Sequence, residues 1–327
     1  MTRIGARNNQ SRRLRAGLAV VLCAAWLAVS GAVSGAVSAT LAAREPQDSA
    51  LATKIQNLLF IVLTTNDDGQ EAVAQAQMKT MFEQRGLPTI AEVGDEAAYE
   101  FVVLAFYHQT PEFRARVLVE GRQSAGRHEI PADALTFLEA RTRLELAKAK
   151  ARAIPPTNTD LRDTILRMAE TDQEVRRRDG FDMAKMEETD KQNEAPLRAI
   201  IDKYSVPTIS MVGPKAANEF VIMVQHQPAD FRQRILPELK ANVDSGEAEP
   251  EAYALVYDRL ERNMGRKQFY GTQLECDPTN TLREASLEDP AGVDRRRAEL
   301  GMMRLRLYER VVREVSPNLC PGPGGKP

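Results

Sequence analysis

One segment of this chain occurs twice in similar form. One copy runs from Val206 to Leu236 and reads VPTISMVGPKAANEFVIMVQHQPADFRQRIL, and the other runs from Leu87 to Leu118 and reads LPTIAEVGDEAAYEFVVLAFYHQTPEFRARVL. Residues 88–104 match residues 207–223 at ten of seventeen positions, with an offset of 119 that falls to 118 before the shared His-Gln pair. A period of this length is typical of a duplicated domain and not of a solenoid repeat.

Both copies carry the pattern of a helix that is buried on all sides. Gly94 and Gly213 each precede a run with apolar residues on every face, and Pro214 suits the first turn of such a helix. Further stretches with helical periodicity surround these runs: Leu51–Leu63, Phe113–Glu120, Ala132–Lys150, Phe231–Val243 and Pro250–Met264. The sequence therefore predicts a mainly α protein of two duplicated helical-bundle domains.

The second copy continues beyond the point where the first one ends. Gln268–Gln273 (QFYGTQ) is rich in β-forming residues, and we expect it to pair with residues from Leu282 onward in a short β-hairpin around residues 268–287. Asp289 and Gly301 are suited to the two ends of a further helix. The predicted division is a first copy, a linker, a second copy with the polar motifs and a disordered tail, at residues 44–151, 152–159, 160–315 and 316–327.

The first 39 residues have the layout of an export signal. They contain five arginines and no acidic residue, followed by an uncharged stretch from Ala16 and then the small residues Val37, Ser38 and Ala39. Either this segment is cleaved, or it stays as a membrane anchor, because its apolar run is long enough to span a bilayer. In both cases we expect an extracytoplasmic protein, periplasmic or secreted.

Net charge, cysteines and histidines limit the partners and cofactors that we expect for this protein. Removal of residues 1–39 takes away five positive charges and changes the formal net charge from −2 to −7, which argues against nucleic acid as a partner. Cys276 and Cys320 remain in a compartment where disulfides persist, either bonded to each other or free. Three dispersed histidines have no zinc-site spacing, so we expect no metal, and no motif calls for a cofactor.

Two helical stripes of the second copy contain polar residues where a core residue is expected. Asp172 lies on the apolar face that begins at Leu161, and Asp190 and Asn193 interrupt the next apolar stripe. A buried carboxylate needs a hydrogen-bonding partner, for which Arg176 and Arg259 are available. The alternative is that Asp190 or Asn193 caps a helix, which would put Pro196 in its first turn.

His226 and Asp258 are the remaining candidates for chemistry. His226 ends the second apolar run, where it is either a functional group beside a groove or a structural histidine. Asp258 and Arg259 align with Ala140 and Arg141, so the first copy lacks the acid. Next to them, QFYGTQ offers hydroxyl and amide groups, which suit either a ligand-binding edge or a hairpin corner.

With these residues in view, the second copy resembles a bacterial family, domain-of-unknown-function family 6624, over about residues 161–315. This sequence differs from the family pattern at Ser205 and Val206, where Gly-Trp is usual, and at Pro196. It rests on the residues Asp172, Gln173, Arg176, Asp190, Asn193, Pro207, Thr208, Val212, Gly213, Gln225, His226, Asp258, Arg259, Gln268, Tyr270, Gly271, Thr272 and Gln273 and on the segment Glu288–Gly301. The family implies a site without naming a ligand, and the first copy is then a degenerate relative.

Three functions are compatible with these patterns. The first is an exported helical binding module whose second copy holds a small polar ligand. The second is a hydrolase with His226 as general base, oriented by Asp258 or Asp172. The third is a structural protein whose buried polar networks only set helix register. The candidate ligand-binding residues are Asp172, Gln173, Arg176, Asp190, Asn193, His226, Asp258, Arg259, Gln268, Tyr270, Thr272 and Gln273.

Overall fold

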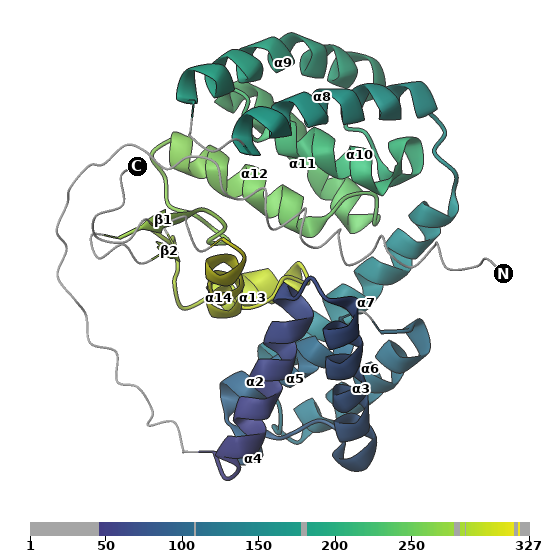
Figure 1. Cartoon of the computed structure of the whole chain (residues 1–327), viewed down its shortest axis with the longest axis vertical. Coiled ribbons are helices and arrows are strands. Elements are labelled where there is room, and N and C mark those ends of the chain that lie inside the picture. The colour runs from purple at the N-terminus through teal and green to yellow at the C-terminus, as the bar shows by residue number, and fades with distance from the viewer. Residues whose placement is uncertain are drawn as a thin grey trace. The chain divides into compact units, whose positions relative to one another are not determined.

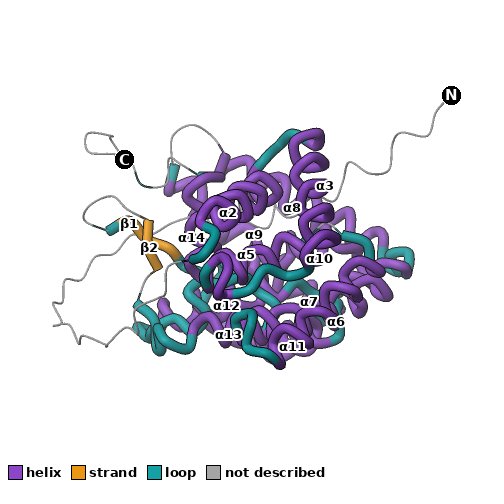
Figure 2. The backbone as a smooth tube through the Cα atoms, turned by 90° about the horizontal axis from the view of Figure 1, so that it is seen from below, coloured by secondary structure: helices purple, strands orange, loops and turns teal. Residues whose placement is uncertain are grey.

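The computed structural model describes residues 46–107, 109–177, 182–277, 282–284, 286–316 and 320. Helices make up most of this part of the chain, and its strands form one short pair (Figure 2). The helices are α2 (Ser49–Thr64), α3 (Asp68–Arg85), α4 (Ile90–Val93), α5 (Asp95–Phe106), α6 (Pro111–Gly126), α7 (Ala132–Ala153), α8 (Thr159–Arg177), α9 (Met183–Tyr204), α10 (Ile209–Val224), α11 (Ala229–Asp244), α12 (Pro250–Asn263), α13 (Val293–Glu299) and α14 (Leu305–Val315). The prediction of a mainly α protein is confirmed.

The described residues form two compact units. The N-terminal unit contains residues 46–142 together with Arg297–Val315, and the C-terminal unit contains Arg143–Arg296 with residues 316 and 320. Helix α7 therefore begins in the N-terminal unit and ends in the C-terminal one. Helix α14 packs with α2. A segment from the C-terminal part of the sequence is therefore part of the N-terminal unit, which sequence order alone does not suggest.

Arg304 holds this closing segment in the N-terminal unit. Its guanidinium donates to both carboxylate oxygens of Asp133, at 2.6 and 2.7 Å, and to Asp95 at 2.6 Å. It also lies over the ring of Tyr99, 4.2 Å from the ring centroid. Ion pairs and a cation–π contact on one guanidinium fix the start of α14 against α5 and α7.

Helix α10 is the centre of the C-terminal unit. Figure 1 shows it among α8, α9, α11 and α12, and α8 is its most extensive partner. Ala216, Phe220 and Val224 of α10 are buried, as are Ile165 of α8 and Ile235 of α11. The run that is apolar on every face is therefore a core helix, as predicted.

A helix start recurs in both units with the same contacts. Ile90 N donates to the carbonyl of Glu129 at 2.7 Å, and Ile209 N donates to the carbonyl of Glu247 at 3.0 Å. The glycine that follows each short helix, at residues 94 and 213, has a φ of 83° and 82° respectively, so that the chain turns before the buried helix begins.

The loop before this helix start is also held in the same way in both units. Glu120 Oε1 accepts from Leu87 N at 2.8 Å, and Glu238 Oε1 accepts from Val206 N at 3.1 Å. These long-range bonds join positions that correspond in the sequence repeat. They favour a duplicated domain, and the duplication itself stays a prediction.

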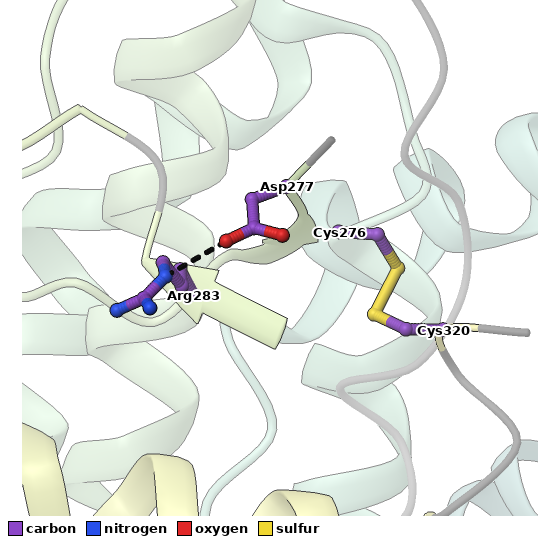
Figure 3. Close-up of a disulfide and its surroundings, with 4 residues drawn as sticks. All are labelled: Cys276, Asp277, Arg283 and Cys320. Carbon is purple, nitrogen blue, oxygen red and sulfur yellow. Dashed lines mark hydrogen bonds and ion pairs between the residues drawn. A yellow bond between two sulfur atoms is a disulfide. The ribbon is translucent and has the colours of Figure 1, made fainter. Parts of the chain in front are cut away.

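The strands β1 (Leu274–Cys276) and β2 (Leu282–Glu284) form an antiparallel hairpin, with Cys276 opposite Leu282. An ion pair from Arg283 to Asp277, at 2.9 Å, lies at the end where β1 leads on to β2, and a disulfide joins Cys276 to Cys320 (Figure 3). The hairpin is confirmed, although its first strand begins after QFYGTQ and not within it. Gln268, the first residue of QFYGTQ, forms an isolated β-bridge with Leu287, in which Gln268 N donates to the carbonyl of Ser286 at 2.9 Å. The amides of Phe269, Tyr270 and Thr272 are used elsewhere, as described below.

One local alternative and one local prediction were wrong. Neither Asp190 nor Asn193 caps a helix, because α9 begins at Met183 with Asp182 as its cap and continues through Pro196. Helix α13 begins at Val293 and not at Asp289, whose carboxylate instead accepts from Gly292 N at 3.1 Å in the preceding turn.

Some predictions lie outside the described residues. These are the export signal at residues 1–39 and most of the tail at 316–327. In the part of the chain that the structure covers, no helix is both long and apolar enough to cross a lipid bilayer.

Candidate functional site

An arginine bridges two carboxylates between α8 and α9. Arg176 Nη1 lies 2.9 Å from Asp172 Oδ1, and Arg176 Nη2 donates to Asp190 Oδ1. The Asp172 side chain is 1% exposed and that of Arg176 is 5% exposed, whereas Asp190 keeps 25% of its surface. The pattern that placed Asp172 and Asp190 on apolar faces therefore led to a buried ion-pair triad.

Two amides complete this Arg176 cluster. Gln173 Nε2 donates to Asp172 Oδ2 at 3.0 Å, and Asn193 Nδ2 donates to Asp172 Oδ1 at 3.5 Å. Burial raises the pKa of Asp172 to about 6 against the opposing charge of Arg176, and burial also raises the pKa of Asp190. Asp172 is thus harder to ionise than an exposed aspartate.

His226 is held by Arg259 at the end of α10. Arg259 Nη1 lies 3.1 Å from His226 Nδ1, and Arg259 Nε donates to Gln273 Oε1 at 3.1 Å. Because a guanidinium only donates, His226 Nδ1 must accept, and the proton of the neutral imidazole resides on Nε2. Burial, followed by the charges of Arg259, Arg176 and Arg232, holds the pKa of His226 well below its usual value. His226 Nε2 is buried and has no hydrogen-bond partner among the described residues.

The Arg176 cluster and the His226 cluster (His226, Arg259, Gln273) are neighbours. Gln227 Nε2 donates to the backbone oxygen of Asp190 at 3.2 Å. The charge of Arg259 lowers the pKa of Asp190, and the charge of Arg176 lowers that of His226. The corner between α10 and α11 therefore meets α8, α9 and α12 at one polar site.

Asp258 binds the chain of QFYGTQ and not His226, which it would orient in the hydrolase hypothesis. Its Oδ1 accepts from Phe269 N at 2.8 Å and Tyr270 N at 2.9 Å, and its Oδ2 accepts from the backbone nitrogen and the hydroxyl of Thr272, both at 2.8 Å. We call this arrangement the Asp258 clamp. It bends the chain around one buried carboxylate and so removes these amides from any β-ladder.

The first and last residues of QFYGTQ, both glutamines, hydrogen-bond to each other across the bend. Gln268 Nε2 donates to the carbonyl of Gln273 at 3.0 Å, and Gln273 N donates to Gln268 Oε1 at 2.7 Å. The Tyr270 ring packs at right angles to Phe269, with centroids 4.9 Å apart. Gln268, Tyr270 and Thr272 thus shape the bend, while Gln273 also reaches Arg259.

Three polar residues of the α10–α11 corner were missed as site residues. Arg232 and Gln225 are 2% and 1% exposed, and Gln227 is 3% exposed. Arg232 follows the apolar Phe231 in the first turn of an amphipathic helix, where a charged residue is usually solvated, so helical periodicity gave no signal. Gln225 and Gln227 flank His226, and that proximity was the available clue.

A comparison with protein families identifies part of the chain. The family of unknown function DUF6624 matches residues 159–317. This second half of the chain is a DUF6624 domain. The prediction from the motif residues is confirmed, and it carries no reaction with it. No curated protein matches the chain, and no solved structure matches it either.

The DUF6624 region contains every candidate site residue. It begins at α8 and continues past α14, which packs in the N-terminal unit. The residues of the DUF6624 motif that the structure brings together are Asp172, Gln173, Arg176, Asp190, Asn193, His226, Arg259 and Gln273. A relationship between the first copy and DUF6624 stays a prediction.

Proposed function

We propose that the DUF6624 half of this protein binds a small polar ligand at the corner between α10 and α11. The observation that carries the proposal is His226 Nε2, a buried N–H with no partner beside a network in which the other ring nitrogen is held. Buried donors in folded proteins are nearly always paired, so an unpaired one at a site with perturbed pKa values points to a ligand or to water.

The surroundings of His226 support binding more than acid–base chemistry. Neither Asp172 nor Asp258 forms a hydrogen bond to His226 in the described part of the chain, and Arg259 occupies Nδ1, where an orienting carboxylate would lie. A pKa well below the usual value also makes His226 a weak base. The hydrolase hypothesis stays a prediction that this geometry does not favour.

The first copy lacks most of this polar set. Asp258 corresponds to Ala140, and no carboxylate aligned with it can form the clamp. In a duplicated protein this difference favours a ligand site in one half and a supporting role for the other. A purely structural role explains the Asp258 clamp, but it leaves His226 Nε2 unexplained.

The test uses two variants of one residue. An asparagine at position 226 offers an amide oxygen near the place of Nδ1 and keeps an acceptor for Arg259, but it removes the Nε2 donor. A glutamine offers an amide nitrogen near Nε2 and keeps that donor. We expect a thermal-shift screen of hydroxy acids, amino acids, sugars and phosphates to find a stabilising compound. His226→Asn should abolish the shift, and His226→Gln should retain part of it.

Two outcomes would contradict the proposal. In one, no compound in the screen stabilises the wild-type protein. In the other, a compound stabilises the wild type and His226→Asn equally. A matched control is Lys240→Gln, which changes an exposed residue paired with Asp244 on α11 and should leave any shift intact.

We also propose that the protein is exported. The layout of residues 1–39 supports this, and so does the Cys276–Cys320 disulfide, because such bonds persist outside the cytoplasm. Cell fractionation with intact-mass measurement tests it. A mature chain that lacks about the first 39 residues indicates a cleaved signal, a full-length chain in the membrane fraction indicates an anchor, and a cytoplasmic full-length chain contradicts export.

A further inference from the structure

Arg232 is a buried cation without a carboxylate partner. It lies in the first turn of α11 and is 2% exposed. Its Nη1 donates to the carbonyl of Gln225 at 3.3 Å, and its Nε has no partner. With the Asn263 amide in the orientation that satisfies both of its polar atoms, Arg232 Nη2 donates to the Asn263 side-chain oxygen at 2.6 Å. No ion pair to Arg232 exists in the described part of the chain, and burial lowers its pKa to about 10 with no acidic neighbour to oppose the shift. A buried charge of this kind is costly unless something pairs with it.

Gln225 and His226, beside Arg232, also have buried side-chain atoms without partners. The side chain of Gln225 is 1% exposed, and neither its Oε1 nor its Nε2 has a hydrogen-bond partner among the described residues. His226 Nε2, on the next residue, is in the same state. The bond from Arg232 to the carbonyl of Gln225 joins α11 to the end of α10. One corner therefore contains three unpaired donor groups and one unpaired acceptor.

The charges that act on His226 have one sign. Arg176, Arg232 and Arg259 all act electrostatically on His226 and keep it neutral. Arg176 is balanced by Asp172 and Asp190, whereas Arg232 has no such balance. An anion is the species that would restore electroneutrality at this corner.

We infer that the ligand of the proposed function is a small anion whose oxyanion pairs with Arg232 and accepts from His226 Nε2. An adjacent hydroxyl or amino group on the same molecule would meet the amide of Gln225, which has both a donor and an acceptor free. The chemical class is thus a hydroxy acid, an amino acid or a small organic phosphate. This inference rests on the proposed function and adds the charge of the ligand to it.

The corresponding arginine of the N-terminal unit is arranged differently. Arg114 occupies the repeat position of Arg232, is only half-buried, and stacks over the ring of Phe106 with its Cζ 4.7 Å from the centroid. Its Nε donates to the carbonyl of Phe106 at 3.1 Å. The deep burial of the arginine is therefore specific to the half that belongs to DUF6624.

The experiment compares anionic and neutral probes on the whole mature protein. Glycolate, glycine, phosphate and 3-phosphoglycerate would be tested at constant ionic strength against glycerol and choline, by thermal shift and by isothermal titration calorimetry. We expect saturable stabilisation by at least one anionic or zwitterionic probe and none by glycerol or choline.

Arg232→Met removes the buried charge with little loss of volume. Because the unpaired cation is costly, the ligand-free variant should melt at or above the wild-type temperature, and its affinity for the anion should fall at least tenfold. Arg234→Met is the matched control. It lies on the same helix, pairs with Asp202 at the surface at 2.6 Å, causes the same change in net charge and should keep the wild-type affinity.

The outcomes separate the inference from the proposed function. If glycerol or choline binds in a His226-dependent way and no anion does, the proposed function stands and the anion inference is wrong. If no probe binds and Arg232→Met melts well below wild type, Arg232 is structural, the corner holds water, and both proposals fail. If Arg232→Met does not fold, Arg232→Lys, which keeps the charge but loses the planar fork, should fold and bind the anion more weakly. An anion affinity equal to wild type would overturn the inference, whether it is measured in Arg232→Met or, if that variant does not fold, in Arg232→Lys.

Discussion

Ser205 and Gly86 adopt the same left-handed backbone conformation at corresponding positions of the two units. Ser205 has φ 62° and ψ −161°, and Gly86 has φ 72° and ψ −151°, each at the C-terminal cap of a helix. This region of backbone space is essentially reserved for glycine, because a Cβ atom meets the backbone there. Ser205 is therefore a strained residue of this chain.

Ser205→Gly should therefore stabilise the protein. The relief of backbone strain is worth about 1 kcal/mol, which corresponds to a rise in melting temperature of roughly 2–4 °C. Calorimetry or circular dichroism melting checks it. The reverse change, Gly86→Ser, should cost more, because the added Cβ would also meet Glu120 Oε1, which accepts from Leu87 N. A Ser205→Gly variant that melts below wild type would show that the strain at Ser205 is smaller than the entropy that glycine adds to the unfolded chain.

The Asp258 clamp should be one of the most sensitive points of the C-terminal unit. Asp258→Ala leaves three backbone N–H groups, two of them buried, and one buried hydroxyl without this acceptor, and we expect a loss of about 4 kcal/mol in the free energy of unfolding. Asp258→Asn keeps one acceptor oxygen and should lose about half as much. Urea unfolding measures both losses. Amide exchange at Phe269, Tyr270 and Thr272 should accelerate in Asp258→Ala, and unchanged exchange there would refute the clamp.

Glu100 should make the stability of the N-terminal unit depend on pH. Burial raises its pKa from 4.5 to about 7, although Arg310 Nη1 lies 2.7 Å from Oε1. The folded state thus holds the proton more tightly than the unfolded chain does. The stability this contributes is complete below about pH 4.5 and is lost as the pH rises to about 7, by at most about 3 kcal/mol.

Glu100→Gln imitates the protonated form and should remove this loss. We expect the variant to be more stable than wild type at pH 8 and nearly equal to it at pH 4.5, as measured by denaturant unfolding across this range. Glu83→Gln, on an exposed residue, is the control and should follow the wild-type profile. A Glu100→Gln variant that loses stability most at high pH would show that the ion pair with Arg310 outweighs the cost of burial.

The disulfide should stabilise the folded chain through the loop that it closes. Cys276 and Cys320 are 44 residues apart in sequence, and a loop of this length corresponds to about 4 kcal/mol as an upper value when the unfolded chain is constrained. The melting temperature should fall on addition of dithiothreitol, and Cys276→Ser with Cys320→Ser should melt at the reduced wild-type temperature in both conditions. Equal melting of the oxidised and reduced wild type would mean that the bond adds nothing to stability.

Local sequence patterns were sufficient to predict a mainly helical fold and most of its helices, although α3 was not among them. A helix such as α10, apolar on every face, has few alternatives to a place inside a bundle, and Asp172 on an apolar stripe had to meet a partner such as Arg176. These are short-range consequences of helical periodicity and of the cost of burying charge.

The tertiary structure alone decided what the polar residues contact. Periodicity shows which face of a helix a residue occupies but not which backbone or side chain meets that face, so it could not show that Asp258 binds the amides of QFYGTQ while Arg232 is buried without a carboxylate. In the same way, the sequence placed α14 at the end of the chain, and its packing with α2 depends on Arg304 reaching Asp95 and Asp133, residues far away in sequence. The pairing of groups distant along the chain is set by the packing of the whole fold, and no local pattern encodes it.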